Sequence, residues 1–161
     1  MSASGQAVAS TENPMSQWVT FFLEEETYGI NVMQVQEVLK MTEIAPVPGA
    51  PDYVIGIINL RGNVVTVVDT RSRFGLPPQE ATDSTRIVII EANGQVVGIL
   101  VDGVAEVVEL NAEEIETAPA VGNDETSRYI QGVHSRGERL VILVDLNKFL
   151  SEDELDEIAE L

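Results

Sequence analysis

The sequence contains no cysteine, and only 5% of its residues are aromatic. Without cysteine the chain can form no disulfide, no zinc–thiolate site and no thiol nucleophile. No apolar run approaches the ~20 residues that a membrane-spanning helix requires, and the N-terminus lacks the basic and apolar regions of a signal peptide. We therefore expect a soluble, cytoplasmic protein without disulfides.

Basic residues are scarce as well, since 9 Lys and Arg stand against 27 Asp and Glu and the net charge is -18. The acids gather at 102–125, with eight acids and no base, and at 151–161, with six acids and no base. Proteins that bind nucleic acid usually present basic patches to the phosphates, so DNA, RNA and anionic membranes are poor partners for this chain. The acids form either a solvated surface or a field that steers a basic partner.

Catalytic motifs are also missing. The only histidine, His134, lies next to Ser135, but no acid/base partner follows at motif spacing and there is no G-x-S-x-G elbow. The glycines match no phosphate-binding fingerprint, and the acids do not form a calcium loop. We predict a protein that is not an enzyme and holds no cofactor or metal, with His134 in a structural role. An enzyme that uses His134 and the acid clusters is the competing hypothesis.

The most informative stretch is 56–74, GIINLRGNVVTVVDTRSRF. Two runs rich in Val and Ile, 54–60 and 64–68, flank a break at Arg61-Gly62-Asn63, which is typical of a hairpin with a tight turn. Asp69 or Thr70 can then cap a short helical turn. The stretch therefore predicts two strands followed by a capped turn.

This unit belongs to an internal repeat, because the second half of the chain reproduces the first. Seven residues recur at a constant offset of 69: Val19, Gly29, Ile30, Val32, Val35, Glu37 and Val38. Tyr53 and Gly56 recur at an offset of 76, and Arg61-Gly62, Val68-Asp69 and Phe74 recur at Arg136-Gly137, Val144-Asp145 and Phe149. Asn59, Leu60, Arg71 and Arg73 occur in the first copy only, so we look for function there.

Each copy holds about five strands, and closure into a small barrel would remove the exposed edges of so short a sheet. We predict a mainly β fold of two small five-stranded SH3-like β-barrels from an internal duplication, with a few short helices. The expected divisions are a flexible tail at 1–16, a first barrel at 17–80, a second barrel at 81–150 and an acidic C-terminal helix at 151–161. Ser151 and Glu154 can form the capping box of that helix.

Two groups of residues have more than one interpretation. Arg61 either braces its turn through carbonyls or an acid such as Asp69, or contacts a partner, because arginine is enriched at interface hot spots. Four valines either belong to the core or form an exposed stripe that would suit a partner: Val35, Val38, Val104 and Val107.

The quoted stretch resembles the signature of the CheW-like chemotaxis coupling proteins, in which a G-x-x-N-L-R-G turn precedes a strand that ends in Asp. The likeness continues through YGINVMQVQEVLK, VVGILVDGVAEVVEL, YIQGV and LVILVDLNKFL, from about Gln17 to Leu150. Thr66 and Thr70 depart from the pattern, since the family commonly has proline and leucine there. With about 16 residues before this region and 11 after it, the chain resembles the free-standing adaptor.

The resemblance implies a double β-barrel adaptor that links transmembrane chemoreceptors to the regulatory domain of the CheA histidine kinase in a membrane-associated array. An adaptor for a related kinase outside chemotaxis is the alternative. Carried over by position, the candidates for kinase contact are Val35, Glu37, Gly56 and Arg61. The candidates for contact with the receptor tip are Ile87, Gly98, Val104 and Val107.

Overall fold

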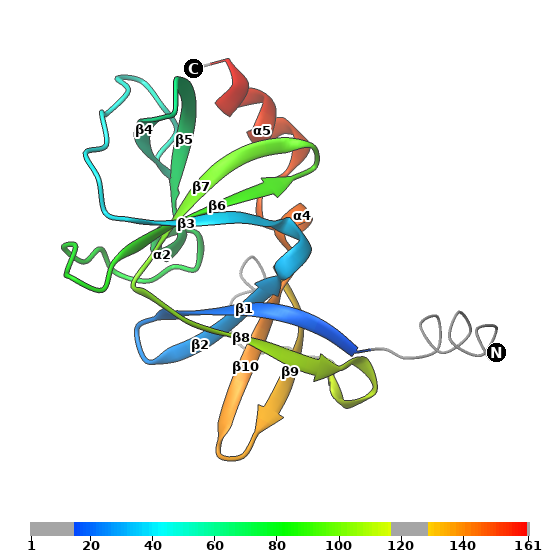
Figure 1. Cartoon of the computed structure of the whole chain (residues 1–161). Coiled ribbons are helices and arrows are strands. Elements are labelled where there is room, and N and C mark those ends of the chain that lie inside the picture. Colours follow the sequence, from blue (N-terminus) through cyan, green and yellow to red (C-terminus); the bar gives the residue numbers. More distant parts are fainter. Residues whose placement is uncertain (1–14, 117–128, 161) are drawn as a thin grey trace.

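The structure is a computed structural model that describes residues 15–116 and 129–160 (Figure 1). The fold is mainly β, as predicted, and consists of two five-stranded sheets with a few short helices. Most of the predicted tail, 1–14, and residues 117–128 lie outside the described residues. The first strand already begins at Met15, slightly earlier than the sequence suggests.

We call the first sheet barrel A; its strand order is β8-β1-β2-β10-β9. Its strands are β1 (Met15–Leu23), β2 (Glu26–Asn31), β8 (Gly103–Asn111), β9 (Ile130–Arg136) and β10 (Arg139–Val144). The second sheet, barrel B, has the order β3-β6-β7-β5-β4. Its strands are β3 (Val35–Lys40), β4 (Val54–Leu60), β5 (Asn63–Asp69), β6 (Arg86–Ala92) and β7 (Gln95–Val101).

Barrel A therefore contains strands from both halves of the chain, so the expected boundary at residue 80 does not separate the two barrels. The β1–β2 hairpin pairs with β8 and β10 from the second copy, while β6 and β7 pair with β3 and β5 from the first. Two of these pairings, β2 with β10 and β5 with β7, are parallel. The expectation of one barrel per half assumed that neighbouring segments pair, and these long-range pairings correct it.

The duplication is nevertheless visible in the topology. If each strand from β1 to β5 is exchanged with its counterpart from β6 to β10, one strand order becomes the other. Each barrel closes in the same way, through an isolated bridge between Ala45 and Ile57 in barrel B and between Glu116 and Val133 in barrel A. The two copies have thus exchanged their first hairpins and otherwise keep the same architecture.

Three apolar clusters hold the molecule together. Barrel A has its own small core around Trp18 and Leu143, and barrel B has one around Val67 and Ile87. The largest cluster lies between the barrels and draws buried side chains from both. Aromatic rings line up within it, from Phe21 and Tyr28 of barrel A through Phe74 and Tyr129 to Phe149. Because this shared core exceeds either private one, burial of apolar surface couples the two barrels.

Short helices follow the last strand of each copy. They are α2 (Thr70–Arg73) and α4 (Leu146–Phe149), and their N-caps are the strand-ending Asp69 and Asp145. 3-10 turns cover Val32–Gln34 and Ala112–Glu114. The C-terminal helix α5 (Glu152–Ala159) begins with the predicted capping box of Ser151 and Glu154. None of the helices in 15–116 and 129–160 is long and apolar enough to cross a membrane.

Candidate partner-binding surfaces

The β4–β5 hairpin presents Arg61 at its tip. Arg61 and Gly62 both have positive φ, 52° and 89°, which is the backbone geometry of a two-residue hairpin turn that matches strand twist. The Asn59 side-chain oxygen accepts a hydrogen bond of 2.8 Å from the Gly62 backbone N–H and fixes the turn. The Arg61 side chain is left 69% exposed at the end of barrel B.

Arg61 forms a bidentate ion pair with Glu37. Its Nη1 donates to Glu37 Oε1 over 3.2 Å, and its Nη2 donates to Oε2. The hydrogen bonds from the Arg61 guanidinium hold the pKa of the Glu37 carboxyl below its ordinary value. Because β3 and β4 lie at opposite ends of the sheet order, the pair spans the gap where barrel B closes. Two residues of the predicted kinase set thus contact each other.

The other two residues of that set lie deeper. Val35 is half-buried and packs against the shared core. Gly56 is buried beside the bridge that closes barrel B, and a Cβ atom there would stand 2.2 Å from the Ala45 carbonyl oxygen. Such an approach leaves no room for any side chain. The fold therefore requires glycine at position 56, because the chain at Ala45 lies too close for a side chain. Any contact with a partner at this place would be made by neighbouring residues.

Exposed apolar side chains accompany the ion pair on barrel B. Val64, next to the β4–β5 turn, is 68% exposed, and Val38 on β3 is 41% exposed. Val64 borders a shallow hollow that is also lined by Ile44, Pro46 and Asn59. Barrel B thus exposes apolar side chains as well as the Arg61 guanidinium, and both kinds of group are common at interfaces.

The predicted receptor set is divided between the barrels. Val107 on β8 of barrel A is 53% exposed, whereas Val104 is half-buried against the shared core. Ile87 is fully buried in the private core of barrel B, and Gly98 packs against it, since a Cβ on Gly98 would lie 3.0 Å from Ile87 Cγ2. A buried side chain cannot touch a partner while the barrel is folded. Only Val107, and Val104 in part, are accessible.

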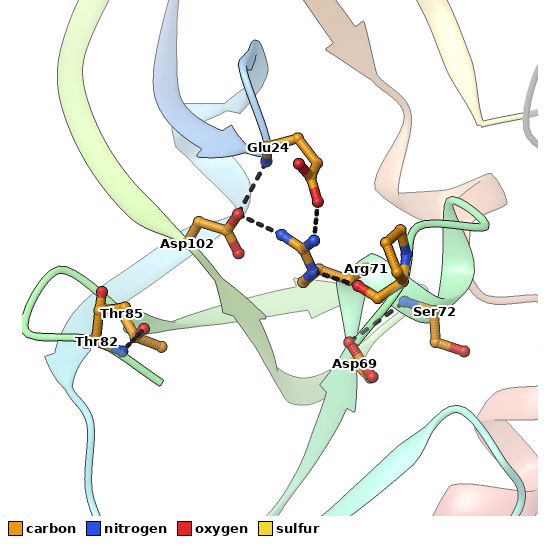
Figure 2. Close-up of polar contacts among 8 residues, drawn as sticks. Glu24, Asp69, Arg71, Ser72, Thr82, Thr85 and Asp102 are labelled. Carbon is orange, nitrogen blue, oxygen red and sulfur yellow. Dashed lines mark hydrogen bonds and ion pairs between the residues drawn. The ribbon is translucent and has the colours of Figure 1, made fainter. Parts of the chain in front are cut away.

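The arginines found only in the first copy are structural. Arg71 is buried and bonded to Glu24, Asp102 and the Pro77 carbonyl oxygen (Figure 2).

Arg73 donates to Glu154 of α5 over 2.7 and 3.0 Å and to the Phe149 carbonyl oxygen over 2.5 Å. Its guanidinium also lies 5.0 Å from the centre of the Tyr53 ring. Burial raises the pKa of Glu154, but hydrogen bonds from Arg73 and Ser151 outweigh it and leave that pKa below its ordinary value.

His134 is buried in β9, and its Nε2 lies 3.4 Å from a Glu114 carboxylate oxygen. Within the described ranges, no group of three or more His, Asp or Glu side chains is arranged to hold a metal ion. A hollow beside His134 is also lined by Glu113, Glu114, Glu116, Ser135 and Gly137. A histidine with one adjacent carboxylate does not make the nucleophile–base–acid geometry that acyl transfer requires, which keeps the structural interpretation of His134.

Comparison with known proteins agrees with this architecture. The CheW-like domain family model matches residues 17–154. The chemotaxis protein CheW of Klebsiella aerogenes is 35% identical over 86% of this chain and 84% of its own, and that of Treponema pallidum is 36% identical over 90% and 88%. The crystal structure of the scaffolding protein TtCheW from Thermoanaerobacter tengcongensis superposes with a TM-score of 0.78, at 33% identity, over 86% of this chain and 94% of that one. With a family match across nearly all of the two-barrel region, the chain belongs to the CheW-like domain family of chemotaxis scaffold proteins.

Proposed function

We propose that this protein is a non-enzymatic adaptor that couples transmembrane chemoreceptors to a CheA-type histidine kinase. Its place of action would be the cytoplasmic face of a membrane-associated receptor array. The receptor tip and the regulatory domain of the kinase would be its two partners. Each would bind mainly to a different barrel.

The observation that carries the proposal is the Arg61–Glu37 pair, which holds an exposed guanidinium at the tip of barrel B, a barrel that also exposes Val64 and Val38. Arginine beside apolar side chains is the composition enriched at the energetic centre of interfaces. A guanidinium that is already held in place by Glu37 also loses less side-chain freedom when a partner binds. This surface is the proposed contact for the kinase regulatory domain.

The receptor surface in this proposal centres on barrel A. Val107 is its exposed apolar anchor on β8, with Val104 at its border. Ile87 and Gly98 then act by shaping barrel B from inside, and they do not touch the receptor. In the same way Gly56 shapes the kinase surface by letting the chain segment at Ala45 approach β4.

Two small surfaces on one chain suit an array. An interface of roughly 1,200 Å² or below binds weakly by itself, and repeated linkage raises the overall avidity. The duplication supplies this arrangement directly, because each barrel offers its own outer surface for a partner.

Binding measurements with a purified receptor-tip hairpin and a purified kinase regulatory domain test the proposal. Arg61→Ala should weaken kinase binding by at least about tenfold, the loss typical of a hot-spot arginine, and leave the thermal midpoint nearly unchanged. Arg139→Ala, an exposed arginine beside the equivalent turn of the second copy, is the matched control and should change neither.

The proposal fails if the unmodified protein binds neither partner. If Arg61→Ala instead lowers the thermal midpoint strongly and both partners bind the folded fraction normally, Arg61 only braces its turn.

A further inference from the structure

Arg71 joins the two barrels through hydrogen bonds from its buried guanidinium (Figure 2). It stands on α2, which follows the last strand of the β4–β5 hairpin in barrel B. Its Nη1 donates to Asp102 Oδ2 over 2.5 Å, its Nη2 donates to Glu24, and its Nε donates to the Pro77 carbonyl oxygen over 2.8 Å. Only 8% of the Arg71 side chain is exposed, whereas the Glu24 and Asp102 side chains are 42% and 23% exposed.

The two carboxylates belong to the points where barrel A meets barrel B. Glu24 lies in the turn of the β1–β2 hairpin, and Asp102 is the only residue between β7 of barrel B and β8 of barrel A. Asp102 Oδ2 also accepts a bond of 2.8 Å from the Glu24 backbone N–H, and the Asp102 N–H donates to the Phe22 carbonyl oxygen over 3.0 Å. One guanidinium therefore fastens a hairpin tip of barrel A to the chain crossing and to α2.

The duplication places a second contact between the barrels at the equivalent positions of the other copy. We call the boundary between the two barrels the seam. Asn147 on α4 lies 76 residues after Arg71, and Asn93 in the β6–β7 turn lies 69 residues after Glu24, so both match by the repeat offsets. Glu24 and Asn93 share a positive φ, 56° and 50°. The Asn93 backbone N–H donates to Asn147 Oδ1 over 3.2 Å, and its side-chain Nδ2 donates to the Asn147 carbonyl oxygen over 3.1 Å.

The two ends of the seam differ in strength. At the Arg71 end, a buried guanidinium bonds to two partly exposed carboxylates, and removal of Arg71 would leave those carboxylates facing each other without a cation. At the Asn147 end, the bonds are neutral and both residues are exposed, so water can replace these bonds at little cost. Asn147 Oδ1 also accepts a bond of 3.3 Å from Gln34 Nε2, in the segment 32–34 that joins β2 to β3. The contact at Arg71 is thus charge-assisted, and the contact at Asn147 is not.

We propose that Arg71 is a positioning residue that sets the angle between barrel A and barrel B. The functional consequence rests on the proposed function: the angle fixes how far apart the kinase surface at Arg61 and the receptor surface at Val107 are held. Neither Arg71 nor Asn147 belongs to those surfaces.

The absence of cysteine from the sequence makes a distance measurement straightforward. Spin labels on Val64→Cys of barrel B and Leu140→Cys of barrel A, both exposed positions, report the separation of the barrels by pulsed electron paramagnetic resonance. Arg71→Gln should broaden and shift the distance distribution, and the matched variant Asn147→Ala should leave it as in the parent. Labels on Val107→Cys and Leu140→Cys, both within barrel A, should give an unchanged distance in each case.

An unchanged distribution in Arg71→Gln overturns the proposal, and so does an equal broadening in Asn147→Ala. Should Arg71→Gln fail to fold, Glu24→Gln is measured instead, because it keeps the Arg71–Asp102 bond. A distance distribution broader than that of the parent supports the proposal, and an unchanged distribution overturns it. The distances do not depend on any partner. If the unmodified protein binds neither partner, the proposed function is rejected, but the proposal about Arg71 is not.

Discussion

Replacement of Gly56 by alanine should destabilise the protein strongly. The new Cβ would stand 2.2 Å from the Ala45 carbonyl oxygen and 2.8 Å from both the Ala45 carbonyl carbon and Ile44 Cγ2. Since ordinary contacts begin near 3.4 Å, the backbone at Ala45 has to move by more than about 1 Å. The bridge that closes barrel B consists of two hydrogen bonds, from Ala45 N to the Ile57 carbonyl oxygen (2.9 Å) and from Ile57 N to the Ala45 carbonyl oxygen (2.8 Å). That movement strains both.

The expected loss follows from these two effects. Overpacking of a filled site costs about 1–3 kcal/mol, and each backbone hydrogen bond contributes about 0.5–1.5 kcal/mol. Together they lower the free energy of unfolding by about 2–6 kcal/mol. For a chain of this size, about 2–4 °C per kcal/mol then predicts a fall in the thermal midpoint of between about 4 and 24 °C.

Calorimetry or circular dichroism melting of three variants measures the effect. Gly103→Ala should be nearly neutral, because the nearest atoms to its new Cβ lie 3.5 Å away. Gly132→Ala, at the equivalent site of the second copy, should fall between the two, since its Cβ meets Ile115 Cγ2 at 2.7 Å and the Glu116 carbonyl oxygen at 2.9 Å. A normal melting point for Gly56→Ala together with lost kinase binding would refute the reasoning and make Gly56 a direct contact.

Three further outcomes are expected. The pKa of Glu154 is lowered in the folded state, so its bonds to Arg73 stabilise the protein fully above the unfolded pKa of about 4.3. This stabilisation is lost as the pH falls through the folded pKa. The difference in melting point between the parent and Glu154→Gln should therefore shrink in acid. A protease site placed in the exposed loop 77–84 should allow complete cleavage without separation of the two fragments on gel filtration; separate elution would contradict the strand exchange. Val107→Met should weaken receptor binding and change the free energy of unfolding by no more than about 0.5 kcal/mol, and a collapsed fold would place Val107 in the core.

Much of the fold follows from local sequence patterns. Alternating Val and Ile around Arg61-Gly62 predict the β4–β5 hairpin, because the turn needs positive φ and the flanking strands need β-branched residues. The capping box at Ser151 and Glu154 was equally predictable, since it depends on residues three apart. The repeat offsets of 69 and 76 also anticipate two barrels with equivalent strands.

The exchange of hairpins between copies could not be predicted in the same way. Both copies carry the same apolar pattern, so β2 meets a suitable partner in either β5 or β10, and pattern alone cannot choose between them. The choice is made in three dimensions, where the rings of Phe21, Tyr28 and Phe74 stack in the shared core. Long-range packing of this kind leaves no spacing signal in the sequence.

The candidate surfaces were only partly predictable for a related reason. Arg61 and Val107 are exposed as a contact requires, Glu37 is half-buried, and Ile87 and Gly98 are buried. A family pattern marks the positions that matter, but it does not say whether they matter for the fold or for a contact. Arg71 and Arg73 were expected to be functional because only one copy has them. Their acidic partners, Glu24, Asp102 and Glu154, lie far away in the sequence, and no short motif links them.

The exchange of hairpins has a mechanical consequence. The chain passes between barrel B and barrel A at residues 32–34 and again at Asp102, so the barrels are joined by covalent backbone at two separate places. A tensile load applied to one barrel and resisted at the other would be carried by peptide bonds as well as by the shared core. Pulling the barrels further apart than these two connections reach would require strands to be peeled from their sheets.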